Sequence, residues 1–164
     1  LNRKTGLYNA DGTGYTYKNA HNTRGVLNNK QYRLADFYLL YAEACLGIGD
    51  ASTATIYLNK VRTRVGLPTY PGYTFKVNGE EITSPTLEEA IRHERRMELA
   101  MEGHRWFDLC RWGVAYEVMT AYMALESSEA KAEMQPFKKG VHELLPIPNK
   151  QRQLNPSLTQ NPGY

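Results

Sequence analysis

Apolar side chains recur every three or four residues between Leu34 and Ile48, which is the spacing of one face of an α-helix. The recurring positions are Leu34, Phe37, Tyr38, Tyr41, Ala44, Cys45 and Ile48. Further leucines lie on the remaining faces, and only Asp36 and Glu43 form a charged stripe. Because a helix that is apolar on most sides must be covered on most sides, the pattern predicts a helix inside a stack of helices.

A second helix is predicted after Asp50, whose carboxylate is suited to cap a helix start. Its apolar stripe consists of Ala51, Ala54, Leu58, Val61 and Val65. The sequence Val65-Gly66-Leu67-Pro68 is typical of a helix end. With the small residues Ala42 and Ala54 at the crossing, the two helices resemble a tetratricopeptide-type hairpin. One hairpin cannot bury its faces alone, so we expect neighbouring helices, partly in a region that precedes this sequence.

The segment 73–83 shows a different period, because its apolar and polar residues alternate around Asn78-Gly79. An Asn-Gly pair between short alternating runs predicts a small two-stranded hairpin. The sequence Thr86-Leu87-Glu88-Glu89 then forms a capping box, which predicts a third helix that runs to about Glu102.

Two shorter helices are predicted next, one through Trp106 to Gly113 and one from Val114 to Leu125. Beyond Gln135 the chain is rich in proline, which favours an extended tail without helix. The predicted fold class is therefore mainly α: a tetratricopeptide-like helical hairpin, further helices, long irregular loops, one small β-hairpin and an extended Pro-rich C-terminal tail.

Composition narrows the functional classes. The 164 residues carry a net charge of +3, and the basic residues are spread among acidic ones. Nucleic-acid binding requires a basic stripe, so we expect no nucleic-acid partner. No apolar run approaches the roughly 18 residues of a membrane span. The sequence starts at Leu1 without Met or signal peptide, and we interpret residues 1–32 as an irregular lead-in and 33–164 as one helical domain.

Catalytic and metal-binding motifs are not evident in the sequence. Glu94, Glu98 and Glu102 share one helix, whereas the paired carboxylates of glycosidases face each other across a cleft. His93-Glu94 begins like a zinc-protease motif, but Met97 stands where the second histidine would be. The cysteine spacing fits no zinc motif. We therefore predict no catalytic residues, no metal and no cofactor.

The same glutamates predict a structural role. On a helical projection, Glu94 and Glu98 fall near the centre of an apolar stripe, and Glu102 continues it. A charged group in such a place needs a partner, because an unpaired buried charge is strongly unfavourable. We predict a buried ion-pair network that fixes how this helix joins the one carrying Trp106 and Trp112. Its predicted members are Glu94, Arg95, Glu98, Glu102, Arg105 and Arg111.

Three stretches together resemble the signature of the SusD/RagB family. They are Arg33–Ala44, the sequence from Glu94 to Gly113, and the ending that contains Leu145-Pro146-Ile147-Pro148, Asn155-Pro156 and Leu158–Tyr164. Their order and approximate spacing also match, from Arg33 to Tyr164. Cys110 is a departure, since the family more often has a charged residue there.

The resemblance implies a largely helical, non-catalytic lipoprotein of Bacteroidetes-type bacteria on the cell surface at the outer membrane. Such proteins bind oligosaccharides, or peptides in some members, and pass them to a SusC-type TonB-dependent transporter. The lipid anchor and much of the ligand site are expected upstream of this chain. The alternative class is a helical-repeat scaffold that binds other proteins.

The segment from Tyr70 to Phe75 is the best sugar-facing candidate within the chain. Tyr70, Tyr73 and Phe75 lie in a loop punctuated by Pro71 and Gly72, and sugars bind to exposed aromatic rings. In the alternative interpretation these rings pack on the helices beneath them.

Overall fold

A computed structural model describes residues 32–77 and 79–164 of the chain. The chain divides into two compact units, one up to Gly103 and one from His104 to Tyr164. The predicted lead-in lies outside the described residues except for Tyr32. The predicted single domain over 33–164 stays a prediction.

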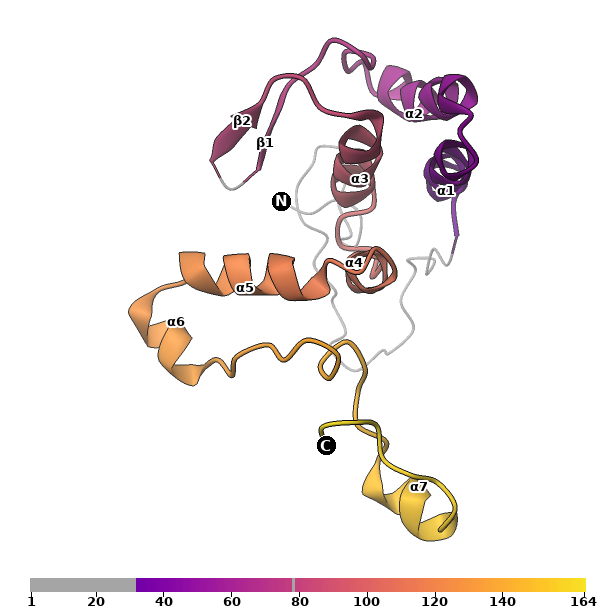
Figure 1. The fold of residues 1–164 in the computed structure, drawn as a ribbon. Helices are drawn as coiled ribbons and strands as arrows, with labels where there is room; N and C mark the ends of the chain where they lie inside the picture. Colours follow the sequence, from indigo (N-terminus) through magenta and orange to yellow (C-terminus); the bar gives the residue numbers. More distant parts are fainter. Residues whose placement is uncertain (1–31, 78) are drawn as a thin grey trace, which may run out of the picture. The chain divides into compact units, whose positions relative to one another are not determined.

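The described part is mainly helical, as predicted (Figure 1). The first unit contains α1 (Leu34–Gly47), α2 (Ala51–Arg64), β1 (Phe75–Val77), β2 (Glu80–Ile82) and α3 (Leu87–Glu98). The second contains α4 (Arg105–Arg111), α5 (Ala115–Leu125), α6 (Ser128–Glu133) and α7 (Asn149–Leu154). The only sheet among the described residues is the antiparallel pair of β1 and β2, in which Phe75 lies opposite Ile82.

The core of the first unit lies where α1, α2 and α3 pack together. Ala42 of α1 and Ala54 of α2 have no exposed surface, so the two helices approach closely at the predicted crossing. Leu39, Leu58 and Ile91 fill the remaining space and are almost completely buried. The predicted helical hairpin is therefore completed in this unit by α3, which covers part of both helices.

Local signals account for the helix starts. The Asp50 carboxylate accepts a hydrogen bond from the Thr53 backbone N–H and caps α2. Thr86 and Glu89 form the complete capping box of α3, with each side chain bonded to the backbone of the other.

The predicted end of the third helix is wrong by about one turn. The helix α3 stops at Glu98, and the chain then turns through Met101 and Gly103, which both have positive φ angles of 66° and 81°. The Glu98 carbonyl accepts a hydrogen bond from the guanidinium of Arg33 at 2.5 Å. A side chain from the start of α1 therefore satisfies a carbonyl that the next helical turn would otherwise have used.

The second unit has a small buried centre and a long C-terminal segment. Leu109 and Ala115 are its buried apolar residues, and Phe137 lies 6.0 Å from the ring of Trp106. The prediction that the tail contains no helix is wrong for α7. This helix follows Pro148 directly and contains no proline. Proline is tolerated at a helix start because the N–H group that it lacks would have no intrahelical partner there.

Candidate functional site: charged contacts of α3, the aromatic loop and a pocket

Two ion pairs join α3 to α2 and α1, and their side chains are almost completely buried. Glu94 accepts a hydrogen bond from Arg62 of α2 at 2.5 Å. One residue further, Arg95 donates to Asp36 of α1 at 3.0 Å. Only 2–5% of each side chain is exposed. At this degree of burial, each charged group needs its partner for stability, because water cannot reach the site to replace that partner.

A second group of charges lies one turn further along α3, around Arg33. Its guanidinium donates to the carboxylate of Glu98 at 2.5 Å and to that of Glu102 at 2.7 Å. Arg64, at the end of α2, also donates to Glu98 at 2.8 Å. The start of α1 and the ends of α2 and α3 are therefore held together by one cluster of charges, which is partly open to solvent.

The structure places four members of the predicted network, Glu94, Arg95, Glu98 and Glu102, in these contacts of the first unit. Their partners include Arg33, Arg62, Arg64 and Asp36, which the sequence reasoning did not assign to the network. One signal could have identified Arg62: it lies four residues after Leu58 and so on the buried stripe of α2.

Asp36 is one of the two residues of the charged stripe predicted on the first helix. The structure buries its side chain against Arg95. A carboxylate on a helix face requires either a cation or water nearby. The sequence alone does not show which of the two a given carboxylate meets.

Arg105 and Arg111 belong to the second unit. Arg111 donates to Asp108 at 2.9 Å, and the guanidinium of Arg105 lies 5.8 Å from the ring centre of Trp112. Both contacts lie within that unit. The predicted role of the network in joining α3 to the helix with Trp106 and Trp112 therefore stays a prediction.

Burial dominates the titration of Glu94. Removal from water raises the pKa of its carboxyl group, while the hydrogen bond and the charge of Arg62 act in the opposite direction. His93, one residue earlier, has its pKa lowered by burial and by the positive charges of Arg62 and Arg96. The imidazole of His93 stacks on the ring of Phe75 with the ring centres 3.9 Å apart.

The predicted sugar-facing loop packs largely on the helices below it. Tyr73 is only 6% exposed, and its ring lies 3.4 Å from the guanidinium carbon of Arg62. Tyr70 exchanges two hydrogen bonds with Asn59 of α2 through its backbone, and both Tyr70 and Phe75 are half-buried. The burial of Tyr73 agrees with the alternative interpretation, in which the rings pack on the helices. Sugar contact through Tyr70, Tyr73 or Phe75 stays a prediction.

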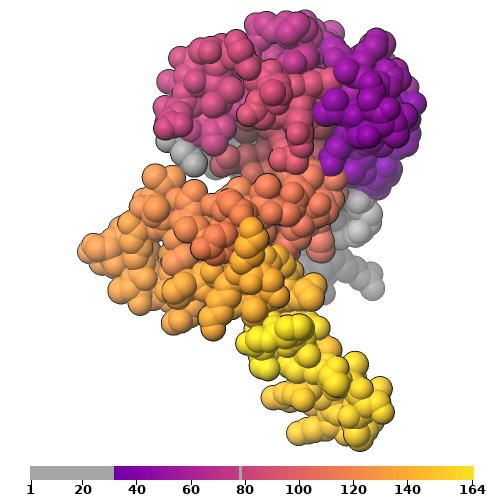
Figure 2. Space-filling view, in the orientation of Figure 1, coloured from indigo at the N-terminus to yellow at the C-terminus, as the bar shows by residue number. Residues whose placement is uncertain are grey.

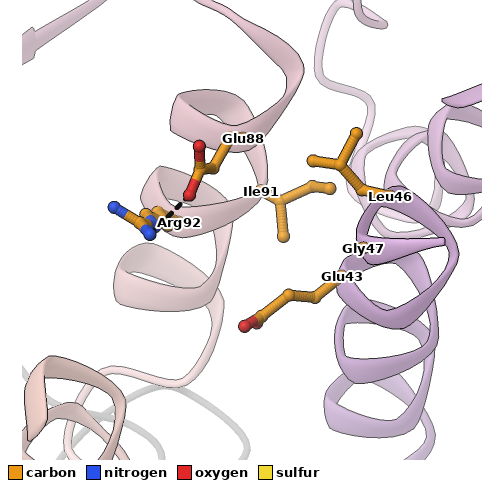
Figure 3. A pocket seen from close by; sticks show the side chains of 6 residues that line it. All are labelled: Glu43, Leu46, Gly47, Glu88, Ile91 and Arg92. Atoms are coloured by element: carbon orange, nitrogen blue, oxygen red, sulfur yellow. Dashed lines mark ion pairs between the residues drawn. The ribbon is translucent and has the colours of Figure 1, made fainter. Parts of the chain in front are cut away.

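An open pocket of about 350 Å³ lies between α1 and α3 (Figure 3). Leu46 and Ile91 point toward each other across it, and Glu43 reaches toward α3 from below. Arg92 is held by Glu88 at 2.5 Å on the outer wall. A pocket of this size, with apolar walls and charged edges, is at the lower limit of small-ligand sites.

Within residues 32–77 and 79–164, no group of three histidine, cysteine, aspartate or glutamate side chains is arranged to hold a metal ion. No helix in that part of the chain is long and apolar enough to cross a membrane. The described contacts of the first unit are those of a helical framework whose apolar core includes two buried ion pairs.

Comparison with known proteins identifies the family. The SusD family profile matches residues 2–164, and the chain belongs to this family. It is 34% identical over 141 residues to SusD-like protein P25 of Formosa agariphila, and 39% identical over 89 residues to a SusD-like protein of Bacteroides ovatus. These matches cover 84% and 52% of the chain.

Solved structures agree. A SusD homolog from Bacteroides thetaiotaomicron superposes with a TM-score of 0.60 and 31% identity over 88% of the chain. A SusD-like protein from Bacteroides fragilis gives a TM-score of 0.58 and 27% identity over 82% of the chain. The chain spans between 14% and 30% of the length of these four relatives.

Proposed function

We propose that the full-length protein binds an oligosaccharide at the bacterial cell surface, without catalysis, and delivers it to a SusC-type TonB-dependent transporter. The observation that carries this proposal is the match of the SusD family profile to residues 2–164. The relatives are named SusD-like, which supports the same type of protein.

The geometry of the carboxylates supports binding without hydrolysis. A general acid must lie within hydrogen-bonding reach of the bond that is cleaved. Glu94 is 3% exposed and forms an ion pair with Arg62. Glu98 forms ion pairs with both Arg33 and Arg64. These two glutamates therefore serve to hold helices rather than to protonate a substrate.

Membrane attachment is proposed through a lipid anchor outside the 164 residues, since the family resemblance implies a lipidated cysteine at the mature N-terminus. Cell fractionation of the full-length protein tests this directly. Recovery in the outer-membrane fraction, lost when the lipidated cysteine is replaced by serine, is the expected result.

Ligand binding is tested with the full-length protein on a glycan array, followed by calorimetry with the best oligosaccharide. The expected result is reversible binding of at least one glycan without release of reducing ends. Binding to peptides but to no glycan would indicate that the protein is a peptide-binding member of the family. Release of reducing ends that disappears in Glu94→Gln or Glu98→Gln would overturn the non-catalytic assignment.

Binding to neither class, together with capture of a protein partner, would favour a helical-repeat scaffold. The variants Tyr70→Ala and Phe75→Ala test the loop in the same assay. Unchanged affinity in correctly folded variants would remove the loop from the ligand site and leave the site to the remaining part of the protein.

A further inference from the structure

The pocket between α1 and α3 combines apolar walls with an edge that carries charges of both signs. Leu46 of α1 and Ile91 of α3 point toward each other across it (Figure 3). Glu43, Glu88 and Arg92 bring two carboxylates and one guanidinium to the same opening. All of the lining residues belong to the first unit. Figure 2 shows that the atoms of α1, in indigo, reach the outer surface of that unit.

Gly47, the last residue of α1, forms part of the pocket wall, and neither its backbone nor its neighbours require a glycine. Its φ angle lies outside the left-handed region that favours glycine. A Cβ atom at this position would meet no described atom within 4 Å, so close packing does not require glycine either. Glycine in a helix lowers stability relative to alanine. The visible effect of the missing side chain is that the pocket stays open.

The charges at the edge favour ligand groups that both donate and accept hydrogen bonds. Glu88 and Arg92 form an ion pair at 2.5 Å, which holds the guanidinium at the outer wall. An ion pair leaves further positions for a ligand, because a carboxylate has several lone pairs and a guanidinium has five N–H groups. A hydroxyl group can bond to either sign of charge. A ligand carboxylate or ammonium would instead lie near a group of its own charge.

A sugar ring has both properties that the pocket requires. A pyranose carries hydroxyl groups around its edge and C–H groups on its faces. The volume of about 350 Å³ lies within the range of small-ligand sites. Leu46 and Ile91 provide an apolar surface for the C–H groups, and Glu43 and Arg92 provide an acceptor and a donor for the hydroxyls.

Building on the oligosaccharide binding proposed above, we propose that this pocket holds one uncharged sugar unit. Leu46 and Ile91 contact a face of the ring, and Glu43 and Arg92 bond to its hydroxyl groups. The pocket discriminates against uronic acids and amino sugars, because each brings a charge that one edge group repels.

Filling the pocket in the full-length protein tests the site. Gly47→Leu adds a side chain to the pocket wall and removes none, and Ser52→Leu adds the same side chain at an exposed position of α2 as the control. Saturation-transfer NMR measures binding of the methyl glycosides of glucose, galactose and mannose. We expect at least one to bind, with an affinity at least about tenfold lower in Gly47→Leu and unchanged in Ser52→Leu. Equal affinity in both variants would overturn the proposal.

Charge selectivity gives an independent measurement on the unsubstituted protein. Glucuronic acid, galacturonic acid and glucosamine, at pH 6 where all three are charged, should bind at least about tenfold more weakly than the best methyl glycoside. Equal or tighter binding of a charged sugar would overturn the proposal. If Gly47→Leu does not fold, Glu43→Gln replaces it and should weaken binding about tenfold, because one charge-assisted hydrogen bond is lost. Unchanged affinity in that variant would contradict the site.

The glycan array distinguishes failure of this site from failure of the proposed function. A protein that binds oligosaccharides on the array, but none of the three methyl glycosides, keeps the proposed function and loses this site. The same holds if Gly47→Leu binds the methyl glycosides as well as the unsubstituted protein. Absence of all glycan binding overturns both proposals.

Discussion

The guanidinium of Arg62 lies between the carboxylate of Glu94, 2.5 Å away, and the ring of Tyr73, 3.4 Å from its centre. The same side chain donates a hydrogen bond from Nε to the carbonyl of Pro68 at 2.6 Å. One arginine on α2 therefore contacts α3, the aromatic loop and the chain that leaves α2. Only 5% of the Arg62 side chain is exposed, so these three contacts take the place of the water that would otherwise surround its charge.

Glu94→Gln is expected to lower the free energy of unfolding of the full-length protein by about 3–5 kcal/mol, because it leaves the buried charge of Arg62 uncompensated. Glu88→Gln is the matched control: it makes the same change on the same helix, in a pair where 59% of the glutamate side chain is exposed. That control should cost at most about 1 kcal/mol. Urea denaturation measures both, and equal losses would contradict the structural role of the pair.

Arg33→Lys is expected to destabilise the protein nearly as much as Arg33→Ala, by about 1–3 kcal/mol. Arg33 reaches the carboxylates of Glu98 and Glu102 and the carbonyl of Glu98 with one planar group. A lysine ammonium keeps the charge but cannot reproduce this fork. Thermal denaturation compares the variants, with Arg92→Lys as a control that should change little; full rescue by lysine would reduce the role of Arg33 to charge alone.

Tyr73 is expected to keep its phenolic proton at high pH. Burial raises its pKa from 10.0 to about 12, and the nearby charge of Arg62 offsets part of this effect. Between these two values the folded state holds more protons than the unfolded state, so stability is fully present below pH 10 and falls as the pH rises toward 12. A near-ultraviolet titration should show a late tyrosine that Tyr73→Phe removes; an unchanged titration curve would contradict the burial of this ring.

The 164-residue chain, expressed by itself, is expected to be poorly soluble or to self-associate. On α1 and at its C-terminal end, Leu34, Phe37, Tyr41 and Ile48 leave apolar surface exposed, and such surfaces promote association. Sedimentation velocity measures this, and Phe37→Lys with Tyr41→Lys should shift the chain toward the monomer. A clean monomer with a cooperative melt in the unsubstituted chain would contradict the prediction.

Local signals in the sequence predicted much of the fold. The 3.6-residue period gave α1 and α2, the capping box gave the start of α3, and the alternation around Gly79 gave the β-hairpin. The end of α3 was not predictable in this way. At this end the Glu98 carbonyl accepts a hydrogen bond from Arg33, which lies 65 residues earlier and cannot be paired with it from local sequence.

The partners within the candidate site could be predicted from the sequence even less than the end of α3. A glutamate inside an apolar stripe indicated that a cation must be near, but the stripe does not say which arginine approaches from another helix. The burial of Tyr73 likewise depends on Arg62 and Ala90, which approach from α2 and α3. Sequence pattern identifies the residues that need partners, and tertiary packing chooses the partners.

The separation between paired charges has a consequence for folding during synthesis. The helices α1 and α2 adjoin in sequence, but the partners of their buried charges are made later. Glu94 follows Arg62 by 32 residues, and Arg95 follows Asp36 by 59 residues. At roughly 5–20 residues per second, the ribosome makes the first of these gaps in about 2–6 seconds. During that time Asp36 and Arg62 remain hydrated on an incomplete hairpin. Because Glu94 and Arg95 are neighbours on one helix, we expect both hydrated groups to lose their water in a single event, when α3 docks.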